Sequence, residues 1–160
     1  MKHVKAQDIT PDLLVTVRGE ASLEEAARLM LHMDVGSLLV VDDPGRLIGI
    51  ITDADFGVRA PDGAAPDDSR VQVLGQVVAP DGLEQVYRAA RRRRVSEVMS
   101  RAVVTVEEHE PVLRILELMA RHRVRHIPVV RDGKPVGLVS TRDLLQLLFQ
   151  DVADPPPVAS

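Results

Sequence analysis

Four side chains, placed in the same way at two points of the chain, are the best suited to hold a ligand. They are a hydroxyl residue and an aspartate three positions later: Thr52 with Asp55, and Ser140 with Asp143. Each hydroxyl follows an apolar run and opens a predicted helix, whose first turn offers free N–H groups and a partial positive charge that favour phosphate. The carboxylate can accept both hydrogen bonds of a ribose diol. The same Ser/Thr-x-x-Asp pattern also makes a plain capping box, so one copy alone leaves both interpretations open.

These two stretches lie at matching positions of an internal duplication. Residues 15–17 and 104–106 both read Val-Thr-Val, and the match continues through Gly49 and Gly137 to the two aspartates. Such self-similarity within one chain indicates two copies of one folding unit. The recurrence of hydroxyl and aspartate in both copies favours a ligand-binding role over capping alone.

Each copy has the pattern of a β-α-β-β-α unit. Apolar residues at i, i+3, i+4 and i+7 predict an amphipathic helix from Leu23 and another from Val112, and unbroken apolar runs predict the strands. The expected strands are 14–17, 37–41 and 47–51 in the first copy and 103–106, 127–130 and 136–139 in the second. A closing helix is expected from Thr52 and from Ser140. One copy buries a marginal core, so the two copies should pack together.

The predicted organisation follows from this pattern and from the composition between the copies. It is a first repeat in 1–60, a linker in 61–94, a second repeat in 95–150 and a disordered, proline-rich tail in 151–160. The linker opens with proline, glycine and aspartate and reads as loop, whereas its second half, 82–94, is expected to be partly helical.

The composition is that of an ordinary globular chain and excludes several classes of function. The 160 residues are 45% apolar and 28% charged, with no cysteine and a net charge of −4. Without cysteine there is no disulfide, thiolate nucleophile or zinc–cysteine site, and a reducing cytoplasm is the expected setting. No apolar run is long enough for a membrane span, and no signal peptide is expected. An acidic chain with few aromatic residues is a poor general binder of nucleic acid.

With these motifs in place, the chain resembles the cystathionine-β-synthase (CBS) domain, and the pair resembles a Bateman module. The resemblance rests on Gly-h-h-Ser/Thr-x-x-Asp in both copies, on Val-Ser-Glu-Val-Met-Ser at 95–100 and on Val-Arg-His-Ile-Pro-Val-Val at 124–130. The first copy is looser, because residues 10–11 are Thr-Pro in place of Met-Thr, and residues 36–37 are Gly-Ser in place of Arg-His. The resemblance implies an α+β fold with two CBS repeats packed about a pseudo-twofold axis.

The resemblance further implies a regulatory module that binds AMP, ADP, ATP or S-adenosylmethionine and has neither catalysis nor a cofactor of its own. Two clefts between the repeats would hold the ligand, with ribose on the aspartate of one copy and adenine and phosphate on the other copy. The implied residues are Thr52, Asp55, Val104, Arg125 and His126 for the first cleft, and Ser140, Arg142, Asp143, Val15, Val35 and Gly36 for the second. Because only the first cleft has an Arg-His pair, we expect unequal sites. A homodimer is also expected, since the leucines at 144, 145 and 148 exceed what a small pair can bury.

Other functions stay open at this point. One is a ligand-free dimerisation or protein-interaction module that acts on an unidentified regulated protein, and another is nucleic-acid binding through Arg91–Arg94, for which a solvated linker is the simpler explanation. His122 and His126 have a zinc-like spacing, but the second should lie in a strand and no further ligand completes a tetrahedral set, so no metal site is expected. The sequence has no hydrolase or Walker-type motif, so an enzyme is not expected.

Overall fold

The computed structural model describes residues 3–149, which form two compact units. The first, here the N-repeat unit, is residues 15–102, and the second, the C-repeat unit, is the described part of 1–14 and 103–160. The predicted tail, 151–160, lies outside the described residues. No helix among the described residues is long and apolar enough to cross a lipid bilayer.

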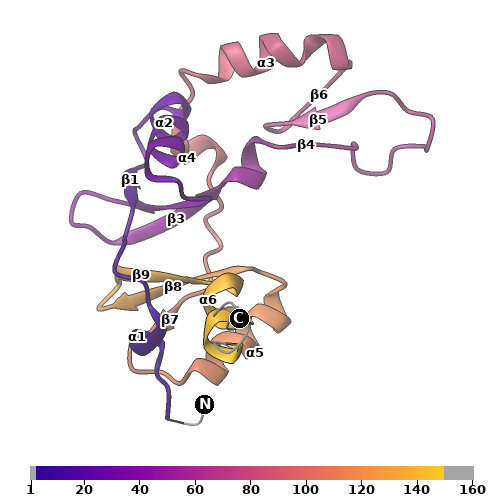
Figure 1. Ribbon diagram of the computed structural model, residues 1–160. Helices are drawn as coiled ribbons and strands as arrows, with labels where there is room; N and C mark the ends of the chain where they lie inside the picture. The colour runs from indigo at the N-terminus through magenta and orange to yellow at the C-terminus, as the bar shows by residue number, and fades with distance from the viewer. Residues whose placement is uncertain (1–2, 150–160) are drawn as a thin grey trace, which may run out of the picture. The chain divides into compact units, whose positions relative to one another are not determined.

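The N-repeat unit is built on a three-stranded sheet of order β1-β2-β3 (Figure 1). Its strands are β1 (Thr16–Arg18), β2 (Ser37–Val41) and β3 (Leu47–Thr52). β1 runs parallel to β2, which pairs with β3 in antiparallel fashion. A helix, α2 (Leu23–Met33), connects β1 to β2, and it begins with a capping box in which Ser22 N–H donates to Glu25 Oε2 over 2.9 Å. Sheet and helix are thus those that the apolar spacing predicts.

The C-repeat unit repeats this arrangement element by element. Its elements are β7 (Val106–Glu107), α5 (Val112–His122), β8 (His126–Arg131), β9 (Lys134–Ser140) and α6 (Thr141–Leu148). The strand order is β7-β8-β9, with a parallel pair followed by an antiparallel one. The register even shifts at matching places, between residues 40 and 41 and between residues 129 and 130. The predicted α+β fold of two repeats is confirmed.

The short helices that precede each repeat belong to the unit of the other repeat. α1 (Ala6–Ile9) contacts the C-repeat unit, where Ala6 N–H donates to the Glu110 carbonyl over 2.8 Å. α4 (Val95–Val98) contacts the N-repeat unit, where Val95 N–H donates to the Ala21 carbonyl over 2.8 Å. The core of each unit therefore includes the short helix that precedes the other repeat in the sequence.

The glycines of the two matching motifs lie where these exchanged segments cross the sheets. A Cβ added at Gly49 would lie 2.5 Å from Met99 Sδ and 3.0 Å from the Ser100 carbonyl oxygen. A Cβ added at Gly137 would lie 1.8 Å from Thr10 Cγ2. Such distances are shorter than a real contact allows, so both positions need glycine for close approach of a neighbouring segment.

The two repeats end differently. The helix expected from Thr52 is only the single 3₁₀ turn η1 (Asp53–Phe56), after which Gly57 is extended. A second small sheet follows, made of β4 (Val58–Arg59), β5 (Val71–Val73) and β6 (Gln76–Val78). β5 and β6 lie in the linker, in the part expected to be loop. Leu74 and Gly75 join β5 to β6 with φ of 49° and 78°, as the favoured two-residue hairpin turns require. After η2 (Pro80–Gly82), α3 (Leu83–Ala90) provides the helix predicted within 82–94.

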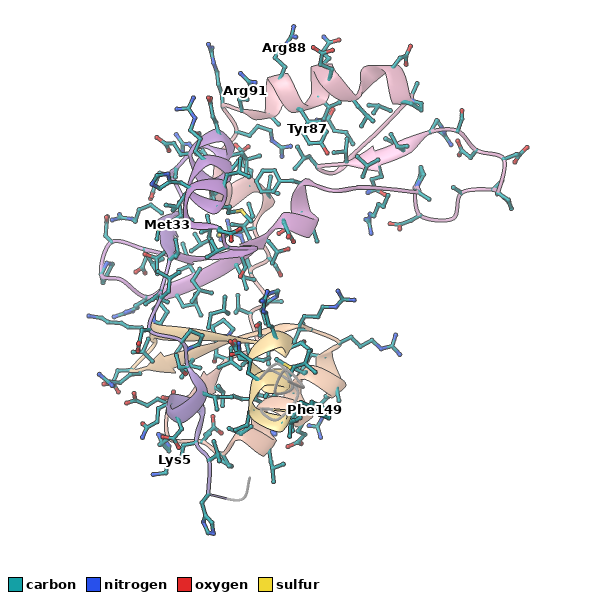
Figure 2. The ribbon with its side chains drawn as sticks, in the orientation of Figure 1. Lys5, Met33, Tyr87, Arg88, Arg91 and Phe149 are labelled. Atoms are coloured by element: carbon teal, nitrogen blue, oxygen red, sulfur yellow. The ribbon has the colours of Figure 1, made fainter. Side chains whose placement is uncertain are left out.

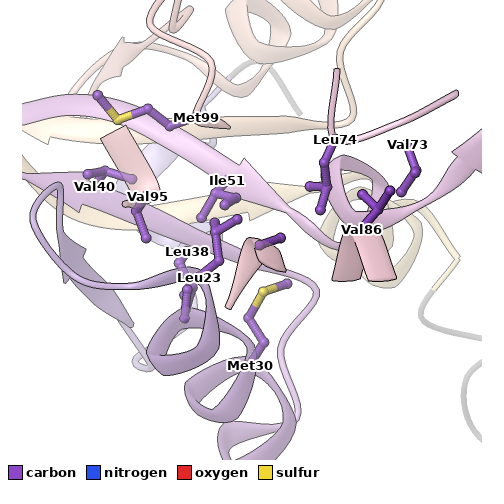
Figure 3. Packing of buried hydrophobic residues seen from close by; sticks show 12 residues of the cluster. Leu23, Met30, Leu38, Val40, Ile51, Val73, Leu74, Val86, Val95 and Met99 are labelled. Atoms are coloured by element: carbon purple, nitrogen blue, oxygen red, sulfur yellow. The ribbon is translucent and has the colours of Figure 1, made fainter. Parts of the chain in front are cut away.

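Each unit has its own apolar core. In the N-repeat unit the hairpin and α3 add Val73, Leu74 and Val86 to side chains from α2 and the sheet (Figure 3). In the C-repeat unit Leu144 of α6 and Ala6 of α1 cover the sheet instead. The linker is therefore part of the folded N-repeat unit.

Candidate ligand site

One edge of each three-stranded sheet collects the residues that sequence analysis singled out. In the N-repeat unit β1 and β2 begin where β3 ends, so Val15, Val35 and Gly36 lie at the same edge as Thr52. Asp53 N–H donates to the Gly36 carbonyl over 2.9 Å, which ties η1 to the start of β2. At this edge, the backbone at the starts of β1 and β2 lies near the hydroxyl of Thr52 and the carboxylate of the turn that follows.

The C-repeat unit forms the matching edge from the second set of residues. Val104 precedes β7, Arg125 precedes β8, and His126 pairs in register with Ser140 at the end of β9. Thr141 N–H donates to the Arg125 carbonyl over 3.1 Å, the counterpart of the bond between Asp53 and Gly36. The residues assigned to either predicted cleft therefore come from both units. Within each unit, the residues at the starts of the first two sheet strands lie at the same edge as the hydroxyl and the aspartate of that unit.

The two aspartates take the same hydrogen bond in both units. Asp55 Oδ2 accepts from Thr52 N–H over 2.8 Å, and Asp143 Oδ2 accepts from Ser140 N–H over 2.7 Å and from Ser140 Oγ over 3.0 Å. Both aspartates are half-buried, and among the described residues no donor reaches Oδ1 of either. The capping bond therefore orients each carboxylate and leaves its second oxygen for a ligand hydroxyl, so capping and binding are compatible.

A cavity of about 540 Å³ opens beside Asp55 within the N-repeat unit. Its walls are η1, the hairpin around Leu74 and the segment from Arg93 to Val98, and Arg59 also lines it. The volume lies within the range of small-molecule sites, which is roughly 300–1,000 Å³. Apart from Asp55, this cavity could not be predicted from the sequence, because several of its walls depend on the hairpin.

The charges around this cavity are mixed. Arg93 lies 3.2 Å from Glu97 in an ion pair and also donates from Nη1 to the Leu74 carbonyl over 3.3 Å. Arg59 has only a 3.7 Å contact with Asp62. Two carboxylates and two guanidinium groups thus line the cavity, and Arg59 is the cation least engaged by the protein itself.

The two sheet edges differ in charge. In the N-repeat unit the Asp53 carboxylate lies over Gly36, where an added Cβ would be 3.2 Å from Asp53 Oδ2. In the C-repeat unit the matching positions are Arg125 and Thr141, followed by Arg142. Arg125 and Arg142 are exposed and make no ion pair within the described part of the chain. Charge therefore distinguishes the two edges, an acidic one and a basic one, whereas the expectation of unequal clefts stays a prediction because each predicted cleft takes residues from both edges.

Two ion pairs with shifted pKa values lie apart from these edges. In the loop before β5, the Asp68 carboxylate accepts from Arg70 Nη2 over 2.8 Å, which lowers the pKa of Asp68 to about 2. In the C-repeat unit, hydrogen bonds from Arg131 lower the pKa of Glu108. Each pair joins two residues of the same unit, and neither includes a residue that lines the cavity beside Asp55.

The two histidines with zinc-like spacing lie on different elements. His122 ends α5 and His126 begins β8, as the predicted strand requires. Within residues 3–149 no group of three or more His, Asp or Glu side chains is placed to hold a metal ion.

These features define a tandem pair of matching α+β repeats, each with a hydroxyl and an aspartate where its last sheet strand meets a helical turn. The sequence pattern of the CBS domain matches residues 6–56 and 95–150. Because these two matches cover more than half of the chain, the protein belongs to the CBS-domain family, and its tandem repeats form a Bateman module.

Related proteins share the whole pair. A CBS domain-containing protein of Dictyostelium discoideum is 30% identical over 145 residues, which cover 90% of each chain. The CBS domain of a membrane protein from Sphaerobacter thermophilus has a TM-score of 0.70 at 37% identity and covers 92% of this chain and 90% of that one. An L-aspartate semialdehyde sulfurtransferase of Methanocaldococcus jannaschii is 27% identical, but the match spans only 22% of that enzyme.

One structural neighbour carries ligands. The CBS domain pair of protein MJ0100 was solved in complex with 5′-methylthioadenosine and S-adenosyl-L-methionine. It has a TM-score of 0.67 and 25% identity, and covers 92% of this chain and 98% of that one.

Proposed function

We propose that this CBS pair is a regulatory module that binds an adenosine-containing ligand, with its ribose on Asp55 or Asp143. The observation that carries the proposal is the repeated carboxylate geometry: in both units Oδ2 is held by the backbone at 2.7–2.8 Å, and Oδ1 has no donor in the described structure. A ribose diol offers two hydroxyl donors at the spacing that one such carboxylate accepts.

The ligands of the MJ0100 pair support the choice of adenosine over phosphate as the common element. Both 5′-methylthioadenosine and S-adenosylmethionine contain adenosine, and neither has a phosphate. AMP, ADP and ATP share the same ribose and adenine. Arg125 and Arg142 make no ion pair with the described residues and would pair with a phosphate chain. The residues Val15, Val35, Gly36, Val104 and His126 would contribute backbone and side-chain contacts to adenine.

We infer further that the module works by binding and not by catalysis. A ligand that binds one conformation better shifts the population towards it, and a regulated partner protein can respond to that shift. The relative from Dictyostelium, which matches this chain over 90% of its length, is itself described as a CBS domain-containing protein.

The test is a thermal-shift titration of the full chain with AMP, ATP, S-adenosylmethionine and 5′-methylthioadenosine. A ligand at a hundred times its Kd stabilises by about 2.7 kcal/mol, which raises the Tm of a chain of this size by about 5–10 °C. Asp55→Asn and Asp143→Asn should each remove part of that shift, and the double variant should remove all of it.

Both aspartates also accept a hydrogen bond from a backbone N–H, so their substitution weakens helix capping as well as ligand binding. A matched control variant separates the two effects. Glu25→Gln removes the charge from the same kind of bond, to Ser22 N–H over 2.9 Å, away from the sheet edges. We expect Glu25→Gln to lower the basal Tm as much as Asp55→Asn does and to leave the ligand-induced shift intact. A shift that persists in the double variant, or no shift with any of the four ligands, would favour a ligand-free interaction module.

A further inference from the structure

A groove of about 370 Å³ lies between α2 and α3 in the N-repeat unit, separate from the cavity beside Asp55. Apolar side chains make up most of its lining: Leu23, Ala27, Leu31, Phe56, Leu74, Tyr87 and Ala90. In Figure 2, Tyr87 lies on the side of α3 that faces the hairpin, while Arg88 and Arg91 project from the helix into solvent. The groove therefore combines an apolar floor with a charged rim.

The floor is apolar and its polar groups are already satisfied. The Tyr87 hydroxyl donates to the Phe56 carbonyl, so the ring forms a wall without an unused donor. Leu31 is 83% exposed although it is a large apolar side chain at the groove. Covering such a side chain is favourable by about 25 cal/mol per Å² of apolar surface removed from water. Leu31 is thus the natural anchor for an apolar side chain of a partner.

The rim carries two arginines and one glutamate, an excess of positive charge in a chain whose net charge is −4. Arg28 and Arg91 line the groove, and Arg28 is 2.7 Å from Glu24 in an ion pair. Arg91 and its neighbour Arg92 make no ion pair within the described residues. The arginine run at 91–94 therefore begins at the rim of an apolar groove, and its first residue keeps an unpaired positive charge there.

We propose that this groove binds a short acidic peptide segment of a partner protein, with a leucine-like side chain against Leu31 and carboxylates on Arg91. The basic rim selects negative charge, and the apolar floor selects an amphipathic peptide. Nucleic acid fits less well, because the groove offers aliphatic surface and Glu24 in place of a continuous basic face. The proposal is independent of nucleotide binding at the aspartates.

The test uses fluorescence anisotropy of the full chain with a fluorescein-labelled peptide of glutamate and leucine, the leucines at i, i+3, i+4 and i+7. We expect saturable binding that weakens about tenfold when lysine replaces glutamate or serine replaces leucine in the peptide. Leu31→Asp should weaken binding about tenfold, and Arg91→Gln about threefold to fivefold.

Two matched variants separate this groove from general surface effects. Leu113→Asp places the same charge at an exposed leucine of α5, outside the groove, and Arg88→Gln removes a charge from α3 at a residue that does not line it. Both should leave peptide affinity unchanged. Because Leu31 is so exposed, Leu31→Asp should keep the parent Tm, so lost binding would not reflect unfolding.

Three outcomes would overturn the proposal. The first is equal affinity for the glutamate and lysine peptides or for the parent and Leu31→Asp. The second is tighter binding of a single-stranded oligonucleotide that Arg91→Gln abolishes, which would assign the rim to nucleic acid. The third is a change of mass in light scattering with Leu31→Asp alone, which would show that the groove is occupied by a second copy of this chain.

Discussion

The two repeats share the turn that carries the aspartate and differ in everything that follows it. In the C-repeat unit the chain continues as the eight-residue helix α6, whose Leu144 enters the core. In the N-repeat unit the turn stops at Phe56, and a hairpin and α3 take the place of that helix. The backbone bond to the aspartate is nevertheless the same, 2.8 Å in one and 2.7 Å in the other. Positioning the carboxylate thus requires only the first turn, which leaves the rest of each repeat free to serve another purpose.

The largest expected effect concerns the surface that α6 has and η1 lacks. Leu145 and Leu148 of α6 remain 52% and 44% exposed, and we expect them to lie at a homodimer interface. Leu145→Asp with Leu148→Asp should raise the dimer dissociation constant by about a hundredfold or more, since each leucine contributes about 1.5–3 kcal/mol when buried. Light scattering at micromolar concentration measures the change.

The N-repeat unit provides the control for this prediction. Val58 of β4 and Val77 of β6 are similarly exposed, at 47% and 46%, on the small sheet that follows the turn in this unit. Val58→Asp with Val77→Asp should leave the mass unchanged. If the parent chain is a monomer at micromolar concentration, α6 is not a dimer interface.

An intermediate effect is expected where the exchanged segments cross Gly49 and Gly137. Gly137→Ala should cost about 1–3 kcal/mol in the free energy of unfolding, because the new Cβ overlaps Thr10 Cγ2. Thr10→Ser removes that methyl and keeps the hydroxyl that donates to the Ala6 carbonyl, so the double variant should regain most of the loss. Urea denaturation of the four proteins measures the coupling.

In the N-repeat unit, a second substitution should restore less of the stability that Gly49→Ala removes. At Gly49 the obstacles are Met99 Sδ and the Ser100 carbonyl oxygen, and Met99→Ala removes only the first while it opens a void in the core. Additive losses for Gly137→Ala and Thr10→Ser would contradict the close approach seen at that glycine.

The smallest effect concerns the loop that only the N-repeat unit has. Because Arg70 lowers the pKa of Asp68 to about 2 from its ordinary 3.8, the bond contributes stability above pH 3.8 that is lost as the pH falls through 2. An NMR titration should find the Asp68 carboxyl titrating near pH 2 in the parent chain and nearer 3.8 in Arg70→Gln. An unchanged titration in the variant would mean that Arg70 is not the cause.

Sequence pattern predicted the regular part of the fold because each repeat buries one face. The spacing of apolar residues from Leu23 and from Val112 gave both long helices, and the duplication gave both sheets. The hairpin was missed because β5 and β6 are three residues each and Leu74 occupies a turn position where glycine or asparagine is expected. Valines on both sides of Leu74-Gly75 were the available signal.

The candidate residues could be named from the sequence, but the side chains around them could not. The recurrence of Thr52 with Asp55 and Ser140 with Asp143 pointed to the two turns, and the structure gives both pairs the same geometry. Arg59 and Arg93, which line the cavity beside Asp55, have no counterpart in the motif, because they reach it only through the missed hairpin. A local sequence pattern therefore predicts the polar groups of a turn, whereas the residues around the turn depend on tertiary contacts.

The 3₁₀ turn has one more consequence, since its consecutive residues Asp55 and Phe56 line different hollows, one the cavity and the other the groove. Leu74 borders both, and the Tyr87 hydroxyl anchors the backbone at Phe56. If a ligand on Asp55 and a peptide in the groove each shifted this turn, their binding free energies would be coupled. By reciprocity the peptide would change the affinity for the ligand by the same factor as the ligand changes the affinity for the peptide. Such a coupling would arise at the turn between the two hollows, where adjacent residues line different walls.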